Sequence, residues 1–194
     1  ERAGVLTALL CVLPIATGAA QGTLTQAAVA AHWGAGAEHV GLVQGLLSGL
    51  ITAFGCFIGG SICNRLNPRN AYSLFGLALA AVALGMAFSP STIPMYIVWN
   101  MLYALVVGLS YAAFTAMALI AIGQRAAATG YNVFASLSNF PLWWLGLVLG
   151  WIADHQGPRS MLIAEAVLGT IGVLVFTFAD RKLWKENKIR LTAV

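Results

Sequence analysis

Long apolar stretches alternate with short polar segments along the whole chain. Five of these stretches carry no charged residue, and a sixth is interrupted only by Glu165; they cover residues 3–31, 40–64, 70–93, 94–123, 126–153 and 160–179. Each reaches the roughly 20 residues that an α-helix needs to cross about 30 Å of hydrocarbon. The pattern therefore predicts an all-α polytopic membrane protein with six transmembrane helices.

The composition indicates which solvent surrounds these helices. Hydrophobic residues make up 60% of the 194 residues and charged residues only 8%, whereas about 25% of residues are charged in soluble domains. Such a chain cannot cover itself with polar groups, so its surroundings must be lipid. Cys11, Cys56 and Cys63 lie within or at the ends of spans, without a CxxC motif or a nearby His. We interpret them as packing residues and expect neither a metal nor another cofactor.

The basic residues are distributed unevenly between the loops that six spans would create. Of the ten Lys and Arg residues, only Arg159 falls on one side of the membrane, and the other nine fall on the opposite side: Arg2, Arg65, Arg69, Arg125, Arg181, Lys182, Lys185, Lys188 and Arg190. Cytoplasmic loops carry the excess of basic residues, so we expect both termini, and a basic tail over residues 181–194, on the cytoplasmic side of the membrane. The membrane that we expect is the bacterial inner membrane. The residues that give the net charge of +4 lie in the loops and the tail on one side of the membrane. This distribution indicates contact with the lipid bilayer and not nucleic-acid binding.

The sequence contains two similar ten-residue segments, GSICNRLNPR and GWIADHQGPR, which align without a gap at an offset of 90 residues. The offset pairs Gly60 with Gly150, Ile62 with Ile152, Asn64 with Asp154, Pro68 with Pro158 and Arg69 with Arg159. It also places the first span on the fourth and the second on the fifth, so we predict two three-helix repeats, residues 1–90 and 91–180. Because three is odd, the second repeat must cross the bilayer in the opposite sense, as inverted repeats of secondary transporters do.

Small residues in and near these segments have physical roles that do not require a function. A Gly lets a neighbouring helix approach, an Asn or Asp can bond exposed backbone groups at a turn, and a Pro begins the next helix, where its missing donor is harmless. Three small-xxx-small pairs predict close helix crossing on the second and fifth spans: Gly45 with Gly49, Gly55 with Gly59, and Gly146 with Gly150.

The segment GSICNRLNPR resembles the G-x-L-a-D-R-x-G-R-K loop signature of the major facilitator superfamily, which follows the second helix of a six-helix half. The stretches VGLVQGLLSGL, YAAFTAMALIAIG and AATGYNVFASLSNFP are similar to the carboxy-terminal half of the peptide and acetyl-coenzyme A transporter branch, which includes muropeptide permeases. By this resemblance, the loop-signature and gating residues are Gly60, Asn64, Arg65, Arg69, Gly150, Asp154 and Arg159. Asn64 stands in place of the signature's Asp, and Asn67 and Pro68 replace its Gly and first basic residue, so we expect no gating ion pair at Asn64.

The resemblance implies a twelve-helix carrier that works by alternating access and is usually coupled to protons. This chain would supply helices seven to twelve, carry a small organic solute, and pair with a missing amino-terminal six-helix half or with a second copy of itself. The chain opens with Glu1 instead of Met, which leads us to expect a fragment or a processed product. The alternative is a membrane scaffold or signalling module that does not transport. An enzyme is the weakest hypothesis, because the spacing gives no Ser-His, Cys-His, paired-carboxylate or metal-ligating arrangement.

Polar residues form stripes along three of the expected helices, at about 100° per residue. The stripes comprise Thr7, Thr17, Gly18, Gln21 and Thr25, with a kink expected at Pro14; Asn100, Tyr103, Gly108, Tyr111 and Thr115; and Asn132, Ser136, Asn139 and Trp143, near Pro141. Amides and phenols are costly in lipid, so the stripes should face protein or a water-filled cavity. The candidates for substrate contact are Gln21, Asn100, Tyr103, Tyr111, Asn139 and Trp143. For each of them, hydrogen bonding between helices is the alternative.

Glu165 is the only carboxylate within a span. Acids inside a membrane are costly enough to be candidates for function, so Glu165 is a candidate for proton coupling. It lies about 9 Å along the helix axis from Arg159. The alternatives are therefore that it extends outward to the membrane surface or pairs with Arg159. At the adjacent turn we expect Asp154 to contact Arg159.

Overall fold

The computed structural model describes residues 11–122 and 127–191, with side chains described up to residue 179 except that of residue 127. Every regular element in these ranges is helical, which confirms the all-α class. The elements are α2 (Ala19–Leu24), α3 (Ala27–Ala30), the 3₁₀ helix η1 (Ala31–Trp33), α4 (Ala37–Val40), the π-helical η2 (Gly41–Leu47), α5 (Ser48–Cys63), α6 (Pro68–Phe88), α7 (Ile93–Ile122), α8 (Ala127–Gln156) and α9 (Pro158–Leu191). The predictions that concern Arg2, Thr7, Arg125 and the side chains of the basic tail lie outside the described residues.

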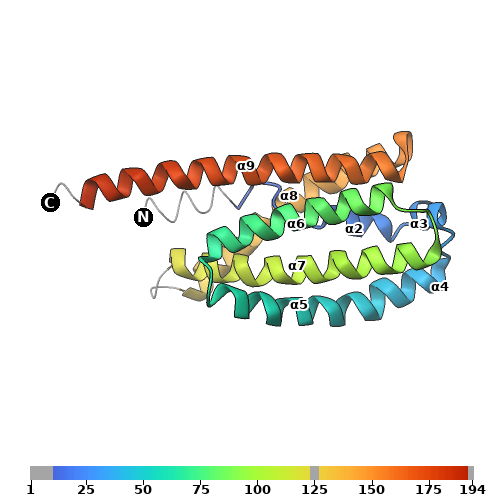
Figure 1. Ribbon diagram of the computed structural model, residues 1–194, viewed down its shortest axis with the longest axis horizontal. Helices are drawn as coiled ribbons and strands as arrows, with labels where there is room; N and C mark the ends of the chain where they lie inside the picture. Colours follow the sequence, from blue (N-terminus) through green and yellow to red (C-terminus); the bar gives the residue numbers. More distant parts are fainter. Residues whose placement is uncertain (1–10, 123–126, 192–194) are drawn as a thin grey trace.

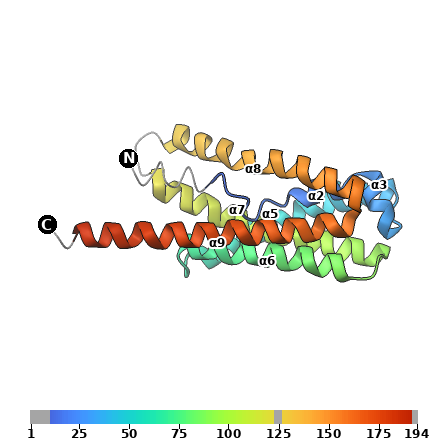
Figure 2. The same ribbon diagram turned by 90° about the horizontal axis from the view of Figure 1, so that it is seen from above.

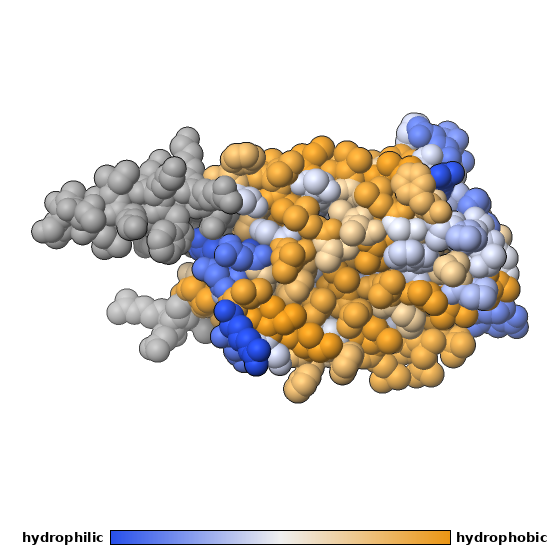
Figure 3. Space-filling view, in the orientation of Figure 1, coloured by the Kyte–Doolittle hydropathy of each residue, from blue (hydrophilic) through white to orange (hydrophobic). Residues whose placement is uncertain are grey.

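Five helical stretches of the described chain are long and apolar enough to cross a membrane. They are Ala37–Cys63, which combines α4, η2 and α5, and Pro68–Phe88, Ile93–Ile122, Ala128–Gln156 and Pro158–Ala179. Figure 3 shows, on the face that it displays, an apolar surface between two hydrophilic ends. A bilayer requires such a belt, so the chain is an integral membrane protein. The sixth span and the inverted repeat stay predictions.

The first expected span, residues 3–31, is not one helix in the part that the structure describes. Residues 11–18 are irregular, and Ala16 and Gly18 have left-handed φ angles of 49° and 65° just before α2 begins. Pro14 has no N–H to donate to a helix, and Gly18 enters the left-handed region at little cost. The prediction of a continuous helix that kinks at Pro14 is therefore wrong, because the chain unwinds there.

Neighbouring helices cover this unwound segment, residues 11–18. The Tyr72 hydroxyl of α6 donates a hydrogen bond to the carbonyl oxygen of Ile15 at 3.1 Å. Gly172 of α9 leaves room for the segment, since a Cβ built there would lie 3.0 Å from the Pro14 carbonyl oxygen. Irregular backbone at membrane depth is tolerated only where protein buries it. The contacts from α6 and α9 supply that cover.

The long helices form a bundle in which α5 packs against α7, and α6 packs against both α7 and α9. The helix α8 packs against α9 and against the short α2, as Figure 2 shows from above. The turn between α5 and α6 and the turn between α8 and α9 lie at opposite ends of the bundle (Figure 1). The helix α6 begins at Pro68 and α9 begins at Pro158, which confirms the prediction for the two aligned segments.

The helices α5 and α7 cross so closely that only glycine fits at their contact. A Cβ on Gly108 would clash with the Thr52 carbonyl oxygen, and a Cβ on Gly55 would clash with the carbonyl oxygen of Leu105. Gly59 meets the α7 backbone in the same way. The prediction of close crossing is therefore confirmed for the pair Gly55 and Gly59, and it involves a third glycine on the partner helix.

The other two small-xxx-small pairs do not mediate close crossing within the described chain. A Cβ built on Gly45, Gly49, Gly146 or Gly150 meets no heavy atom within 4 Å. These glycines lie on surfaces of the second and fifth spans that no described helix covers. Spacing alone could not distinguish them from the pair on α5 that faces α7.

The turn between α8 and α9 is not closed by the expected contact between Asp154 and Arg159. The Arg159 guanidinium lies 4.8 Å from the ring centroid of Phe88, at the end of α6. No ion pair joins Arg159 to Asp154 in the part of the chain described. An exposed ion pair gains little, whereas the aromatic face offers the cation a contact that also excludes water. Gly157, at a φ of 85°, lets the chain reverse before α9.

Candidate functional site

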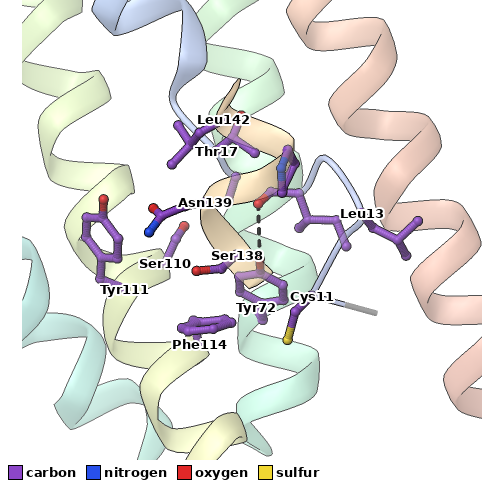
Figure 4. Close-up of a pocket in the computed structure, with 13 residues that line it drawn as sticks. Cys11, Leu13, Thr17, Tyr72, Ser110, Tyr111, Phe114, Ser138, Asn139 and Leu142 are labelled. Atoms are coloured by element: carbon purple, nitrogen blue, oxygen red, sulfur yellow. Dashed lines mark hydrogen bonds between the residues drawn. The ribbon is translucent and has the colours of Figure 1, made fainter. Parts of the chain in front are cut away.

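A pocket lies between the unwound segment, α7 and α8, and we name it the Asn139 pocket (Figure 4). Its volume is about 40 Å³. Its lining residues are Cys11, Leu13, Ile15, Ala16, Thr17, Tyr72, Ser110, Tyr111, Phe114, Ser138, Asn139, Pro141 and Leu142. Figure 4 shows Asn139 extending toward Ser110 and Tyr111. This volume suits a few water molecules, whereas small-molecule sites measure about 300 to 1,000 Å³. A solute site here would need a further wall.

The pocket is continuous with a row of exposed side chains, which we name the Asn139 row: Tyr111 of α7 and Asn132, Ser136, Asn139 and Trp143 of α8. Tyr111 is 52% exposed and Trp143 is 64% exposed. Asn139 and Trp143 lie within about 4 Å of the middle of α8, at the depth where a bilayer is hydrocarbon. An exposed amide at that depth is costly in lipid, so the Asn139 row must face other protein or water.

Glu165 of α9 is buried and joins three elements, and we name this arrangement the Glu165 clamp. Its Oε1 accepts a hydrogen bond from the Ala20 N–H of α2 at 3.0 Å, and its Oε2 accepts one from the Tyr103 hydroxyl of α7 at 2.7 Å. A cavity of about 10 Å³ lies beside it. Because both carboxylate oxygens are bonded inside the bundle, Glu165 neither extends to the membrane surface nor pairs with Arg159, and these two alternatives are wrong.

Side-chain amides connect the first span, the second span and α7, and we name these contacts the amide network. Gln21 Nε2 donates to Ser48 Oγ at 3.4 Å, and Ser48 Oγ donates to Gln44 Oε1 at 3.4 Å. Gln44 Nε2 donates to Asn100 Oδ1 at 2.7 Å, and Asn100 Nδ2 donates to the Tyr96 carbonyl oxygen at 2.8 Å. Asn100 is fully buried. The network therefore holds Gln21 and Asn100 in contacts between helices.

The structure thus separates the six predicted cavity residues into three groups. Tyr111, Asn139 and Trp143 belong to the exposed Asn139 row, where the Trp143 ring centroid lies 6.0 Å from that of Phe140. Gln21 and Asn100 belong to the amide network, and Tyr103 belongs to the Glu165 clamp. The residues of the first group are exposed, whereas Asn100 and Tyr103 are fully buried and the partly buried Gln21 is held by Ser48.

The loop-signature residues lie at or near the two ends of the bundle, apart from all three groups. Gly60, Asn64, Arg65 and Arg69 are at the α5–α6 end, and Gly150, Asp154 and Arg159 are at the opposite end. Asn67 caps α6, because its Oδ1 accepts a hydrogen bond from the Arg69 N–H at 3.0 Å. The cap explains why α6 starts where it does.

Sequence reasoning missed Gln44, Ser48 and Tyr72. Gln44 lies in η2, and π-helical turns often mark functional sites because they redirect side chains. A lone amide in an apolar span was the available signal for Gln44, since such a group needs a partner. Tyr72 gave no such signal, because its partner is a backbone carbonyl of a segment whose unwinding the hydrophobic pattern does not predict.

Replacing Asn100 with leucine is expected to destabilise the bundle by about 1 to 2 kcal/mol. The change removes the acceptor of the Gln44 amide and leaves that partly buried amide without its 2.7 Å partner. Unfolding in bicelles, followed by denaturant titration, measures the loss. The double replacement Asn100→Leu with Gln44→Leu should cost less than the sum of the single changes, by about 0.5 to 1.5 kcal/mol. Strict additivity would contradict a direct bond between the two side chains.

No protein-family model, curated protein or solved structure matches this chain. The resemblance of the loop segment to the major facilitator superfamily therefore stays a prediction. A function must be inferred from the Asn139 pocket, the Glu165 clamp and the amide network themselves.

Proposed function

We propose that this chain forms the carboxy-terminal six-helix half of a secondary transporter and moves a small organic solute by alternating access. The observation that carries the proposal is the exposed Asn139 row at mid-membrane depth. A polar row facing lipid would be strongly disfavoured. A second six-helix unit set against α7 and α8 would bury the row and turn the small pocket into one wall of an enclosed polar cavity. That unit is either a missing amino-terminal half or a second copy of this chain.

The packing of the helices supports an inverted repeat. The helix α5 is the second span, and it packs against α7, the fourth span. If the two repeats are equivalent, the first span should pack against the fifth in the same way. The contact of α2 with α8 meets that expectation, and the third spans of both units, α6 and α9, pack against each other. The unwound segment before α2 also agrees with the discontinuous helices that line transporter sites near the bilayer midplane.

The chemistry of the Asn139 pocket favours a neutral, hydrogen-bonding part of the solute. Within the described chain its lining offers hydroxyl groups, an amide and a thiol, and it contains no Asp, Glu, Lys or Arg. A strongly ionic group would need a counter-charge from the covering half. The resembled transporter branch adds candidate solutes, namely short peptides, muropeptides and acyl-coenzyme A compounds, together with a proton gradient as the driving force.

The charges lead us to assign both termini to the cytoplasmic side of a bacterial inner membrane. The α5–α6 turn carries Arg65 and Arg69, and α9 extends past the bundle at the same end, into the basic tail (Figure 1). The α8–α9 turn carries Arg159 alone. Basic residues are retained on the cytoplasmic side.

Labelling of single cysteines from outside the cell tests the inverted repeat. In a background in which Cys11, Cys56 and Cys63 are replaced by alanine, Gln156→Cys should react with a membrane-impermeant maleimide on intact spheroplasts. Leu66→Cys should react only after permeabilisation, because its turn lies at the other end of the bundle. If both positions react from the same side, the inverted repeat is lost and the transporter proposal with it.

Uptake into proteoliposomes tests transport itself. The chain, paired with its second half or with a second copy, should accumulate at least one of three labelled probes: dialanine, a muropeptide or acetyl-coenzyme A. Accumulation should require an inwardly directed proton gradient and should stop when a protonophore is added. A folded and paired complex that takes up none of these probes would favour the scaffold or signalling alternative.

A further inference from the structure

The Glu165 clamp ties a buried carboxylate to the break in the first span. Ala20, whose N–H bonds to Glu165, is the second residue of α2, directly after the unwound segment. Tyr103 holds the other carboxylate oxygen from α7. Glu165 itself belongs to α9, which packs against α6 and α8. The carboxylate therefore links the start of α2 to α7 and α9. Two further bonds, from Gln21 to Ser48 and from Tyr96 to the Leu24 carbonyl oxygen, join α2 to α5 and α7 without the carboxylate.

We propose that Glu165 is the proton-binding residue of this transporter and that protonation of Glu165 loosens the first turn of α2 from α7 and α9. The inference rests on the proposed transport function and adds to it the coupling site and the element that moves. It places the coupling proton at a carboxylate that touches the broken span, and not at the loop-signature residues. The proposal also explains why residues 11–18 are unwound. An irregular segment lets the following helix shift, whereas a continuous helix would hold it in place.

The two protonation states of Glu165 hold α2 with different strength. The ionised carboxylate accepts from both the Ala20 N–H and the Tyr103 hydroxyl, and hydrogen bonds to a charged acceptor are roughly twice as strong as neutral ones. Protonation removes the charge and makes one of the two oxygens a donor. If Oε2 takes the proton, Tyr103 must turn its hydroxyl hydrogen away. If Oε1 takes it, the Ala20 N–H faces a protonated oxygen, which is a weaker acceptor than the carboxylate. In both cases the clamp holds at high pH and weakens as the pH falls.

In the described part of the chain, Tyr103 is the only titratable side chain that faces Glu165. The other elements around the carboxylate contribute Pro14, Ala16 and Thr17 from the unwound segment, Gly76 and Leu79 from α6, and Leu145 from α8. None of these residues carries a positive charge. A proton is therefore the ligand that neutralises the buried carboxylate.

The Asn139 pocket adjoins the cavity beside Glu165. The cavity beside Glu165 has a volume of about 10 Å³, and Ala16 and Thr17 line both this cavity and the Asn139 pocket of about 40 Å³. These volumes suit one water molecule and a few water molecules, respectively. A hydronium ion in the pocket can pass its proton by way of the Thr17 hydroxyl to the carboxylate, which leaves water behind and a neutral acid on Glu165. Return of that proton to water on the other side of the membrane completes the cycle.

The same wall couples the proton to the solute. Thr17 lies two residues before α2 and lines the pocket that the solute would enter. When the first turn of α2 is loosened, this wall of the pocket is free to shift, so protonation and solute binding affect one another. By linkage, the influence must be equal in both directions.

Hydrogen exchange tests the clamp without any solute. The chain in lipid nanodiscs is exchanged between about pH 5 and pH 9, and the peptide covering residues 15–24 is followed by mass spectrometry after correction for intrinsic exchange rates. Protection of this peptide should fall about tenfold from high to low pH, because a charge-assisted bond is lost. Glu165→Gln should exchange at every pH as the unchanged chain does at low pH. Protection of α7 peptides should stay constant and reports that the bundle remains folded.

Tyr72→Phe is the matched control, because Tyr72 also holds the unwound segment but its partner is the Ile15 carbonyl oxygen, which does not titrate. This variant should exchange faster at every pH and keep the same ratio between high and low pH. Tyr103→Phe should reduce the ratio of protection between high and low pH. If Glu165→Gln does not fold, this variant serves as the test in its place. Either of two results would overturn the proposal: protection of peptide 15–24 that does not change with pH in the unchanged chain, or the same ratio of protection between high and low pH in Glu165→Gln. Solute uptake alongside a pH-independent clamp would leave transport standing and reject only this inference.

Discussion

Replacing Gly108 with valine is expected to push α5 away from α7 and to destabilise the bundle by about 3 kcal/mol or more. Even a single Cβ on Gly108 would clash with the Thr52 carbonyl oxygen and would lie 3.0 Å from the Cys56 backbone nitrogen. Both neighbours are backbone atoms, which cannot rotate away as a flexible side chain can. Steric trapping or denaturant titration in bicelles measures the loss in the free energy of unfolding.

Gly49→Val is the matched control for this prediction. Gly49 lies on α5, one of the two crossing helices, but a Cβ built there meets no heavy atom within 4 Å. Valine at this exposed position should therefore change the free energy of unfolding by less than about 0.5 kcal/mol. Equal losses in the two variants would show that the crossing at Gly108 is not what holds these helices together.

Replacing Asn139 with alanine is expected to reduce solute uptake about tenfold, while the free energy of unfolding of the bundle stays nearly unchanged. Asn139 is exposed at the middle of α8 and makes no hydrogen bond within the described chain. Its removal therefore leaves no partner unsatisfied. A hydrogen bond to a bound solute, worth about 1.4 kcal/mol, corresponds to a factor of about ten in affinity. Initial uptake rates and thermal unfolding of the same preparation separate the two effects.

Asn132→Ala provides the comparison for Asn139→Ala. It makes the same change on the same row of α8, two turns earlier, where the residue does not line the Asn139 pocket. Its effect on uptake should stay below about twofold, because a residue outside the pocket lining makes no bond to a solute held there. Tyr111→Ala, in the pocket lining, should behave like Asn139→Ala. Unchanged uptake in both pocket variants would remove the pocket from the transport path.

The hydrophobic pattern was sufficient to locate the five long helices found among the described residues. The reason is that a span is a local property, set by about 20 consecutive apolar side chains. The starts of α6 and α9 were predictable for a similar reason, because Pro68 and Pro158 act on the turn of chain that immediately follows them. The exposed row through Asn139 also followed from local periodicity, since it depends only on helical geometry.

The unwinding of residues 11–18 could not be predicted in this way, because the segment is apolar whether it is helical or not. What decides its conformation are partners far along the chain: Tyr72 is 57 residues from Ile15, and Glu165 is 145 residues from Ala20. The same distance explains the errors about Glu165. Its neighbour in sequence, Arg159, suggested an ion pair, whereas its neighbours in space offer two hydrogen-bond donors.

The late position of these partners has a consequence for how the protein is made. The unwound segment leaves the ribosome before α9 does, yet the carboxylate that bonds Ala20, in the helix that follows this segment, lies 145 residues later on α9. Until α9 is synthesised, the segment has only the protein cover that earlier helices such as α6 supply, and backbone groups without cover are costly in lipid. The insertion machinery must therefore keep residues 11–18 out of the acyl chains, or beside a chaperone, until synthesis of α9 is complete. A nascent chain that stops before α9 should expose this segment and become a target for membrane proteolysis.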